Sequence, residues 1–197
     1  MEGWDDFLRD QENLRSTIRK QHKLSEERLG KIRRSSLTRR INYPEHKEAF
    51  DYVHDLYPFV NIKQANIYHT SSAVLFDVGY VGMGGFYDIA NRVVVITGQF
   101  PSAHVGENEI VAEFSTDEVL CHELIHYCAN FKNAASSREV EEEIAYGKSI
   151  NYLRMKGRSD DFIIRKNMMP YLISVIDKKA VVHRVLTKRY NLQTLHT

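Results

Sequence analysis

The feature that most constrains this chain is a short histidine-containing motif inside an apolar stretch. His122, Glu123 and His126 form the pattern His-Glu-x-x-His. Histidines four positions apart lie on one face of an α-helix, about one turn apart, so both imidazoles can reach the same ion. The intervening carboxylate can reach a water beside that ion and accept its proton. The pattern therefore predicts a zinc site (Zn2+) with a general base.

The residues around the motif predict a helix from Thr116 to Asn130. Ser115 and Glu118 occupy the first and last positions of a Ser-x-x-Glu capping box, which marks a helix start. Apolar residues follow at helical spacing, at Val119, Leu120, Leu124 and Ile125. The alternative interpretation is that the two histidines are polar residues on a half-buried helix, satisfied by neighbouring carboxylates.

A second helical stretch is predicted from Arg138 to Tyr152, and it contains Glu142-Glu143-Ile144-Ala145. A His-Glu-x-x-His helix followed by Glu-x-x-Ala on the next helix resembles the gluzincin branch of the zincin metallopeptidases. The resemblance covers about residues 60–155. It implies that His122, His126 and Glu142 are the zinc ligands and that Glu123 is the catalytic base.

Four glutamates crowd the start of the second stretch, and only the offset to Ala145 selects Glu142. Glu139 lies one turn earlier on the same helical face and is the alternative third ligand. The same acidic run also fits a solvated helix start, where carboxylates favour the positive end of the helix dipole. The resemblance further makes Tyr146 and His183 candidates for stabilising the transition state. For His183 the competing interpretation is a packed helix.

The expected fold class is α+β. Ser72–Tyr80 is apolar and β-branched, which favours a strand, the glycine-rich run 82–85 turns the chain, and Arg92–Thr97 is typical of a second strand. The resemblance implies a zincin-like core, in which a small mixed or antiparallel sheet packs on the motif helix and the following Glu helix. In that family an edge strand pairs with an extended peptide substrate. Further helices are predicted at His46–Tyr57, Asp160–Met168 and Pro170–Tyr190.

Charge is strongly partitioned along the chain, although the net charge is only +1. Residues 13–43 hold ten Lys or Arg against two Glu, residues 105–143 hold two against ten acidic groups, and residues 144–197 hold eleven against three. We therefore divide the chain into a basic helical arm (1–43) and a metallopeptidase domain (44–197) with C-terminal helices from about residue 158. An acidic centre suits a cation site.

The basic arm indicates a partner of opposite charge. We interpret it as docking on an acidic surface of an assembly partner, with nucleic acid as the alternative. No stretch approaches the roughly 20 apolar residues of a membrane span, and Met1–Asp10 lacks the pattern of a secretion signal. We therefore expect a cytoplasmic protein without a membrane partner. Cys121 and Cys128, about 10 Å apart along one helix, are expected to be reduced.

The leading functional hypothesis is a zinc metallopeptidase that hydrolyses amide bonds of a protein or peptide with a metal-activated water and Glu123 as base. The alternative is a structural or interaction subunit of a larger assembly, such as a virus particle, on a zincin-like scaffold. The intact Glu123 argues against that alternative. A further alternative is a nucleic-acid-associated protease guided by the basic arm.

Overall fold

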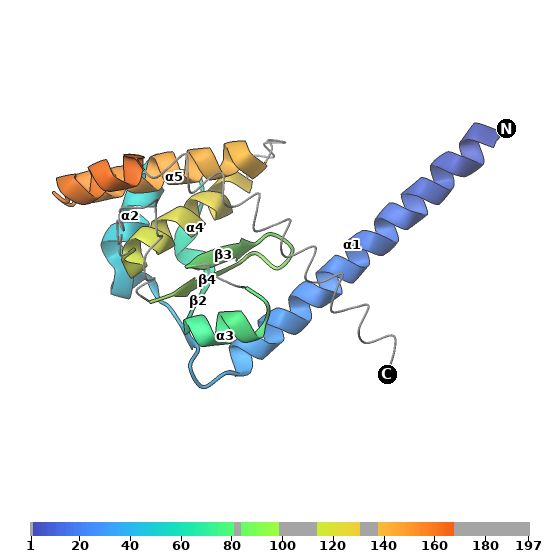
Figure 1. Cartoon of the computed structure of the whole chain (residues 1–197), viewed down its shortest axis with the longest axis horizontal. Coiled ribbons are helices and arrows are strands. Elements are labelled where there is room, and N and C mark those ends of the chain that lie inside the picture. Colours follow the sequence, from blue (N-terminus) through green and yellow to red (C-terminus); the bar gives the residue numbers. More distant parts are fainter. Residues whose placement is uncertain (1, 81–83, 99–113, 131–137, 168–197) are drawn as a thin grey trace, which may run out of the picture.

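The computed structural model describes residues 2–80, 84–98, 114–130 and 138–167, without the side chains of 2–12, 14, 15, 18, 130, 138 and 139. It is an α+β structure with a four-stranded mixed sheet and helices on both of its faces (Figure 1). The elements run in the order α1 (Glu2–Arg34), β1 (Arg39–Arg40), η1 (Tyr43–His46), α2 (Lys47–Leu56), η2 (Ile62–Gln64), β2 (Asn66–Thr70), α3 (Ser72–Asp77), β3 (Gly85–Asp88), β4 (Val93–Thr97), α4 (Thr116–Asn130) and α5 (Arg138–Met155).

The sheet has the strand order β1-β2-β4-β3. Its two central strands, β2 and β4, run parallel, and each pairs antiparallel with the edge strand beside it. Every residue of β4 is buried, which agrees with its continuous run Val-Val-Val-Ile-Thr, because helices cover both faces of this strand. β3 is left as the edge strand on the side of α4.

One face of the sheet packs against α4 and α2. Ile67 of β2 and Val94 and Ile96 of β4 lie in one buried cluster with apolar residues of α2, α4 and α5. Full burial of an aliphatic side chain of this size stabilises a fold by about 1.5–3 kcal/mol. This cluster therefore fixes α4 on the sheet and α5 on α4.

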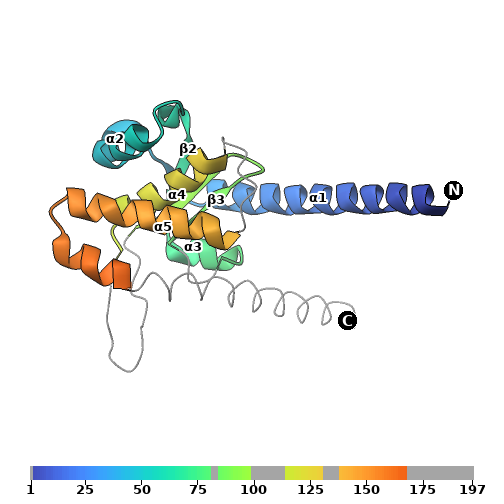
Figure 2. The same ribbon diagram turned by 90° about the horizontal axis from the view of Figure 1, so that it is seen from above.

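The opposite face packs against α3 and the last turns of α1. Leu29 and Ile32 of α1 lie in a second buried cluster with Val93 and Val95 of β4. The predicted basic arm thus contributes its C-terminal end to the core, and β1, which precedes residue 44, pairs with β2. The remainder of α1 projects away from the sheet and its helices (Figures 1 and 2).

The predicted strand at Ser72–Tyr80 is wrong. Ser72–Asp77 forms α3, whose start is capped by the Ser71 hydroxyl, which accepts a hydrogen bond from the Val74 N–H at 3.3 Å. Val74 and Leu75 are buried while their neighbours are exposed, so helical packing overrides the β-branched composition. The parallel strand is instead β2, Asn66–Thr70, which the sequence patterns did not reveal.

Other predicted elements are confirmed. α4 has the predicted bounds, α5 starts at Arg138 as predicted, and β4 and α2 lie within their predicted ranges. Residues 159–167 are helical, in agreement with the predicted helix from Asp160, whereas Pro170–Tyr190 and His183 lie outside the described residues. Cys121 and Cys128 are both buried thiols outside any disulfide. None of the described helices is long and apolar enough to cross a membrane.

Candidate metal centre

The helix α4 carries the His-Glu-x-x-His motif on a firmly anchored scaffold. Its first turn is capped by the Ser115 hydroxyl, which accepts a hydrogen bond from the Glu118 N–H at 3.3 Å. Leu120, Leu124 and Ile125 are fully buried and fix the opposite side of the helix on the sheet. The two histidines of the motif face α5, which lies along α4 (Figure 1).

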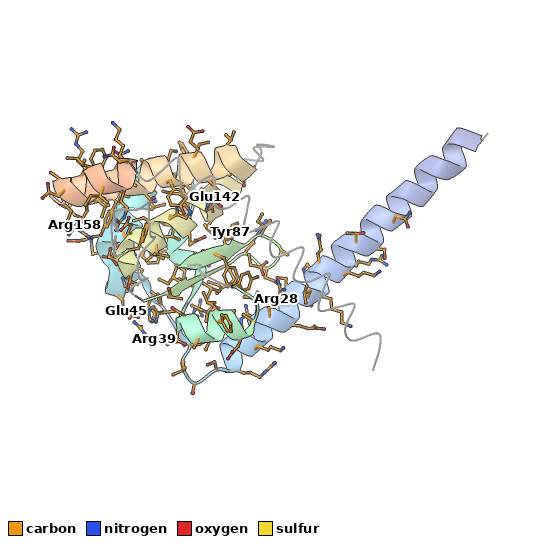
Figure 3. All side chains as sticks on the ribbon, in the orientation of Figure 1. Arg28, Arg39, Glu45, Tyr87, Glu142 and Arg158 are labelled. Atoms are coloured by element: carbon orange, nitrogen blue, oxygen red, sulfur yellow. The ribbon has the colours of Figure 1, made fainter. Side chains whose placement is uncertain are left out.

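Three predicted ligands converge between α4 and α5. The Nε2 atoms of His122 and His126 lie 3.1 Å apart, and Oε2 of Glu142 lies 3.2 Å from the first and 3.4 Å from the second. Each of the three side chains is 12% exposed. These residues form a group whose donor atoms could hold a metal ion. Figure 3 labels the member on α5, Glu142. The geometry brings together the two motif histidines and Glu142.

The donor set fits zinc. Two imidazole nitrogens and one carboxylate oxygen are the ligands of many catalytic zinc sites, which keep a fourth position open. Atoms bonded to one tetrahedral zinc at about 2.0–2.1 Å lie about 3.3–3.4 Å apart, close to the three observed separations. Hydrogen bonds alone satisfy this triangle poorly, because two imidazoles that both donate to Glu142 would place their N–H groups against each other.

The electrostatics of the cluster match this donor set. Burial lowers the pKa of His122 below its ordinary value, although Glu142 opposes the shift. Burial also disfavours the charged form of His126, but Glu142 and Glu123 outweigh it and raise its pKa. Burial would raise the pKa of Glu142, yet its hydrogen bonds with the two histidines hold that pKa well below the usual range. Glu142 is therefore an anion, as a metal ligand requires.

The predicted base, Glu123, lies where α4 meets the edge strand β3. Its side chain is buried and packs against Gly85. A Cβ at Gly85 would lie 2.8 Å from the carbonyl oxygen of Val95 and 3.1 Å from Cγ of Glu123. Only glycine allows this close approach of strand and helix. The sequence patterns placed Gly85 in a turn, and the Phe86-Tyr87 pair after it was the available signal for a strand.

Tyr146 is an aromatic neighbour of the cluster. Its ring centroid lies 4.3 Å from that of His122. Burial, together with the carboxylates of Glu142 and Glu123, raises the pKa of Tyr146, so its hydroxyl keeps its proton. On the same histidine, Nδ1 of His122 is buried with no hydrogen-bond partner among the described residues. A ligating histidine usually donates that N–H to an acceptor, so this second interaction is a departure from the common pattern.

The other glutamates of α5 take different positions. Glu143 is exposed, and Glu141 is half-buried near His126 without joining the three-atom group. The side chain of Glu139, the alternative ligand, lies outside the described side chains. Among the described residues, Glu142 alone completes a group of three with the two histidines.

The start of α4 is held by two further polar contacts. Glu118 is buried and forms a forked ion pair with Arg165, with oxygen–nitrogen distances of 2.7 and 3.3 Å. Asp117, one residue earlier, accepts a hydrogen bond from the Tyr152 hydroxyl at 3.2 Å and lies 2.5 Å from Nδ1 of His46. These contacts tie α4 to residues 159–167, to α5 and to the start of α2.

Comparison of the chain with protein-family models, with curated proteins and with solved structures finds no match. The site is therefore interpreted from its own geometry.

Proposed function

We propose that this chain is a zinc-dependent metallopeptidase of the gluzincin type. The observation that carries the proposal is the convergence of His122, His126 and Glu142 at mutual donor distances of 3.1–3.4 Å. The presence of Glu123 one residue after the first of these histidines supports catalysis over a purely structural metal. A structural zinc site is usually closed by four protein ligands, whereas this group offers three within the described part of the chain.

The residues of the chain have distinct roles in the proposed reaction. Zinc supplies Lewis-acid chemistry, since it polarises a carbonyl oxygen and makes water a nucleophile near neutral pH. The carboxylate of Glu123 accepts the proton of the attacking water and passes it to the nitrogen of the departing amine. Tyr146, which keeps its proton, is a candidate hydrogen-bond donor to the oxyanion that develops on the carbonyl.

The edge strand β3 supports a peptide as the substrate. Among the described strands, β3 pairs with β4 alone, and its first residue, Gly85, touches Glu123. An extended peptide that pairs with this edge would run past the proposed base, which is the β-augmentation mode of recognition. In this proposed mode, the scissile amide of a protein or peptide lies beside Glu123 and the candidate metal centre.

Metal content is the first test of the proposal. Elemental analysis of the purified full chain should find about one zinc per chain, which is the stoichiometry expected of a catalytic site with three protein ligands. His122→Ala and His126→Ala should lose that zinc, because each removes a ligand. His22→Ala, on the exposed part of α1, is the matched control and should keep it.

The outcomes separate the proposal from its alternative. Zinc in the wild type and the control, together with release of amines from a mixed protein substrate, supports the peptidase. A folded, zinc-treated wild type that binds no zinc would overturn the proposal in favour of an interaction subunit on a zincin-like scaffold.

A further inference from the structure

A corner of the molecule far from the candidate metal centre in sequence is densely basic. Residues 28–44 contain six Lys or Arg and no Asp or Glu. Five of the six are exposed, at Lys31, Arg33, Arg34, Arg39 and Arg40. Lys31, Arg33, Arg34 and Arg40, together with Tyr68, are called the basic corner below. The end of α1 lies at the lower edge of the molecule in Figure 1, where the chain turns back toward the sheet.

Arg33 and Arg40 are both neighbours of Tyr68. The guanidinium carbon of Arg33 lies 5.2 Å from the centroid of the Tyr68 ring. Arg40 is opposite Tyr68 in the antiparallel pair of β1 and β2, so their side chains lie on the same face of the sheet. Arg40 also donates a hydrogen bond to Oδ1 of Asn66 at 3.0 Å. These contacts orient both guanidinium groups before any ligand arrives.

The other two cations are carried by the last turn of α1. Lys31 and Arg34 are three positions apart and therefore neighbours on one face of the helix. Neither has an ion pair with any residue that the structure describes. By contrast, Arg39, on the other face of β1, is paired with Glu45 and is not part of the basic corner (Figure 3).

We propose that the basic corner binds the phosphate backbone of a polynucleotide. Lysine and arginine side chains supply most of the affinity of proteins for nucleic acids through phosphate contacts. Arginines that are already held against an aromatic ring pair with phosphate at little further entropic cost, and their planes are also able to stack on a base. The chain as a whole carries a net charge of only +1, so attraction of a polyanion depends on this local cluster.

An anionic membrane is the less favoured partner. A helix that lies on a membrane inserts its apolar face, while its cations meet the lipid headgroups. At the end of α1 the apolar face is occupied, because Leu29 and Ile32 are buried against the sheet. A phosphate backbone requires only the cationic face, which is the face that remains exposed. This proposal goes beyond the peptidase activity and does not depend on it.

The test is binding of the full chain to short fluorescently labelled DNA and RNA oligonucleotides, measured by anisotropy. The wild type should bind, and its affinity should fall steeply between about 50 and 200 mM salt, as phosphate contacts require. Lys31→Glu with Arg34→Glu should weaken binding at low salt by at least about tenfold and reduce the slope of log affinity against log salt by about 1.8.

The control carries the same charge change at a distant surface. Arg154→Glu with Lys166→Glu replaces two exposed cations on α5 and on residues 159–167, and it should leave binding within about twofold of the wild type. Equal losses in both double variants would overturn the proposal, because the effect would then follow net charge. Absence of binding by the folded wild type, or tighter binding to vesicles of anionic lipid than to either oligonucleotide, would also overturn it.

Discussion

The helix α4 takes part in two groups of polar side chains that are largely shielded from solvent, an ion pair at its start and a His-His-Glu cluster one turn later. At its start, Glu118 is enclosed and neutralised by the guanidinium of Arg165, which is itself 1% exposed. One turn later, His122 and His126 face Glu142 of α5 and form a triangle of donor atoms. The first arrangement is satisfied by two protein charges in a forked geometry. The second has the donor atoms of a metal site.

The difference separates a structural ion pair from a candidate metal centre on the same helix. A buried carboxylate needs a partner that compensates its charge. Where the role is structural, another side chain of the protein is enough, as Arg165 is for Glu118. A catalytic zinc site instead gathers several donors around one point and keeps a general base beside it. Glu123, which contacts Gly85, is the base in the function proposed above. Mutations at the two arrangements should therefore have different effects.

The largest effect is expected for the base. Glu123→Gln should reduce peptide hydrolysis by about 10²–10⁴-fold, since general acid–base catalysis typically contributes that much. Zinc content should stay at the wild-type level because Glu123 is not a ligand. Parallel assays of turnover and elemental zinc check both statements. Loss of zinc in this variant would show that Glu123 is itself a metal ligand and not a separate base.

Mutation of the Glu118–Arg165 ion pair should lower the stability of the fold. Arg165→Met leaves Glu118 buried without its cation, and we expect the free energy of unfolding to fall by about 3–5 kcal/mol in denaturant titrations. Glu118→Leu combined with Arg165→Met removes both charges and should recover most of that loss. Folded Arg165→Met should still bind one zinc. If stability and zinc binding fell together in the double variant, the ion pair and the candidate metal centre would be energetically coupled.

Variants of the glutamates on α5 test which residue is the third metal ligand. Glu142→Ala should weaken zinc binding by at least about 100-fold, more than the 10–100-fold typical of residues that merely support a ligand. Glu139→Ala and Glu143→Ala should change it by much less, and competition with a chromogenic chelator measures all three. A larger loss for Glu139→Ala would transfer the ligand assignment to that residue.

The smallest effect is expected at Asp117, at the surface end of α4. Its contact with His46 lowers the pKa of Asp117, so the contact stabilises the fold above the ordinary carboxyl pKa and is lost as pH falls through the lowered value. Asp117→Asn should cost less than about 1 kcal/mol at neutral pH, because the pair is partly exposed. The difference from wild type should vanish in strong acid. Asp77→Asn, at an exposed position on α3, is the control and should show no such pH dependence.

The sequence predicted the site better than the sheet around it. Residues that belong to one helix have fixed spacing, so the face shared by His122 and His126 follows from position alone. The offset between Glu142 and Ala145 predicted the third member of the group, and Ala145 is indeed fully buried within the core cluster around α4. Helix–helix contacts of this kind depend on a small residue, which leaves a trace in the sequence.

The sheet was harder to predict because its strands depend on distant partners. Asn66–Thr70 alternates weakly and becomes a strand through its pairing with β4, while Ser72–Asp77 has a stronger apolar pattern and forms a helix behind the Ser71 cap. Gly85 gave the signal of a turn, although its role is to let β3 approach Glu123. Local propensity carries no information about such tertiary contacts.

The two cysteines of α4 can report how often this helix separates from the elements packed around it. Cys121 and Cys128 flank the motif, both thiols are buried, and burial raises the pKa of Cys121 well above its ordinary value. A thiol-specific reagent can therefore modify them only when this helix separates from its neighbours, since reaction requires an accessible thiolate. The labelling rate measures how often the centre of the domain opens, and a ligand that holds α4 to α5 will slow it.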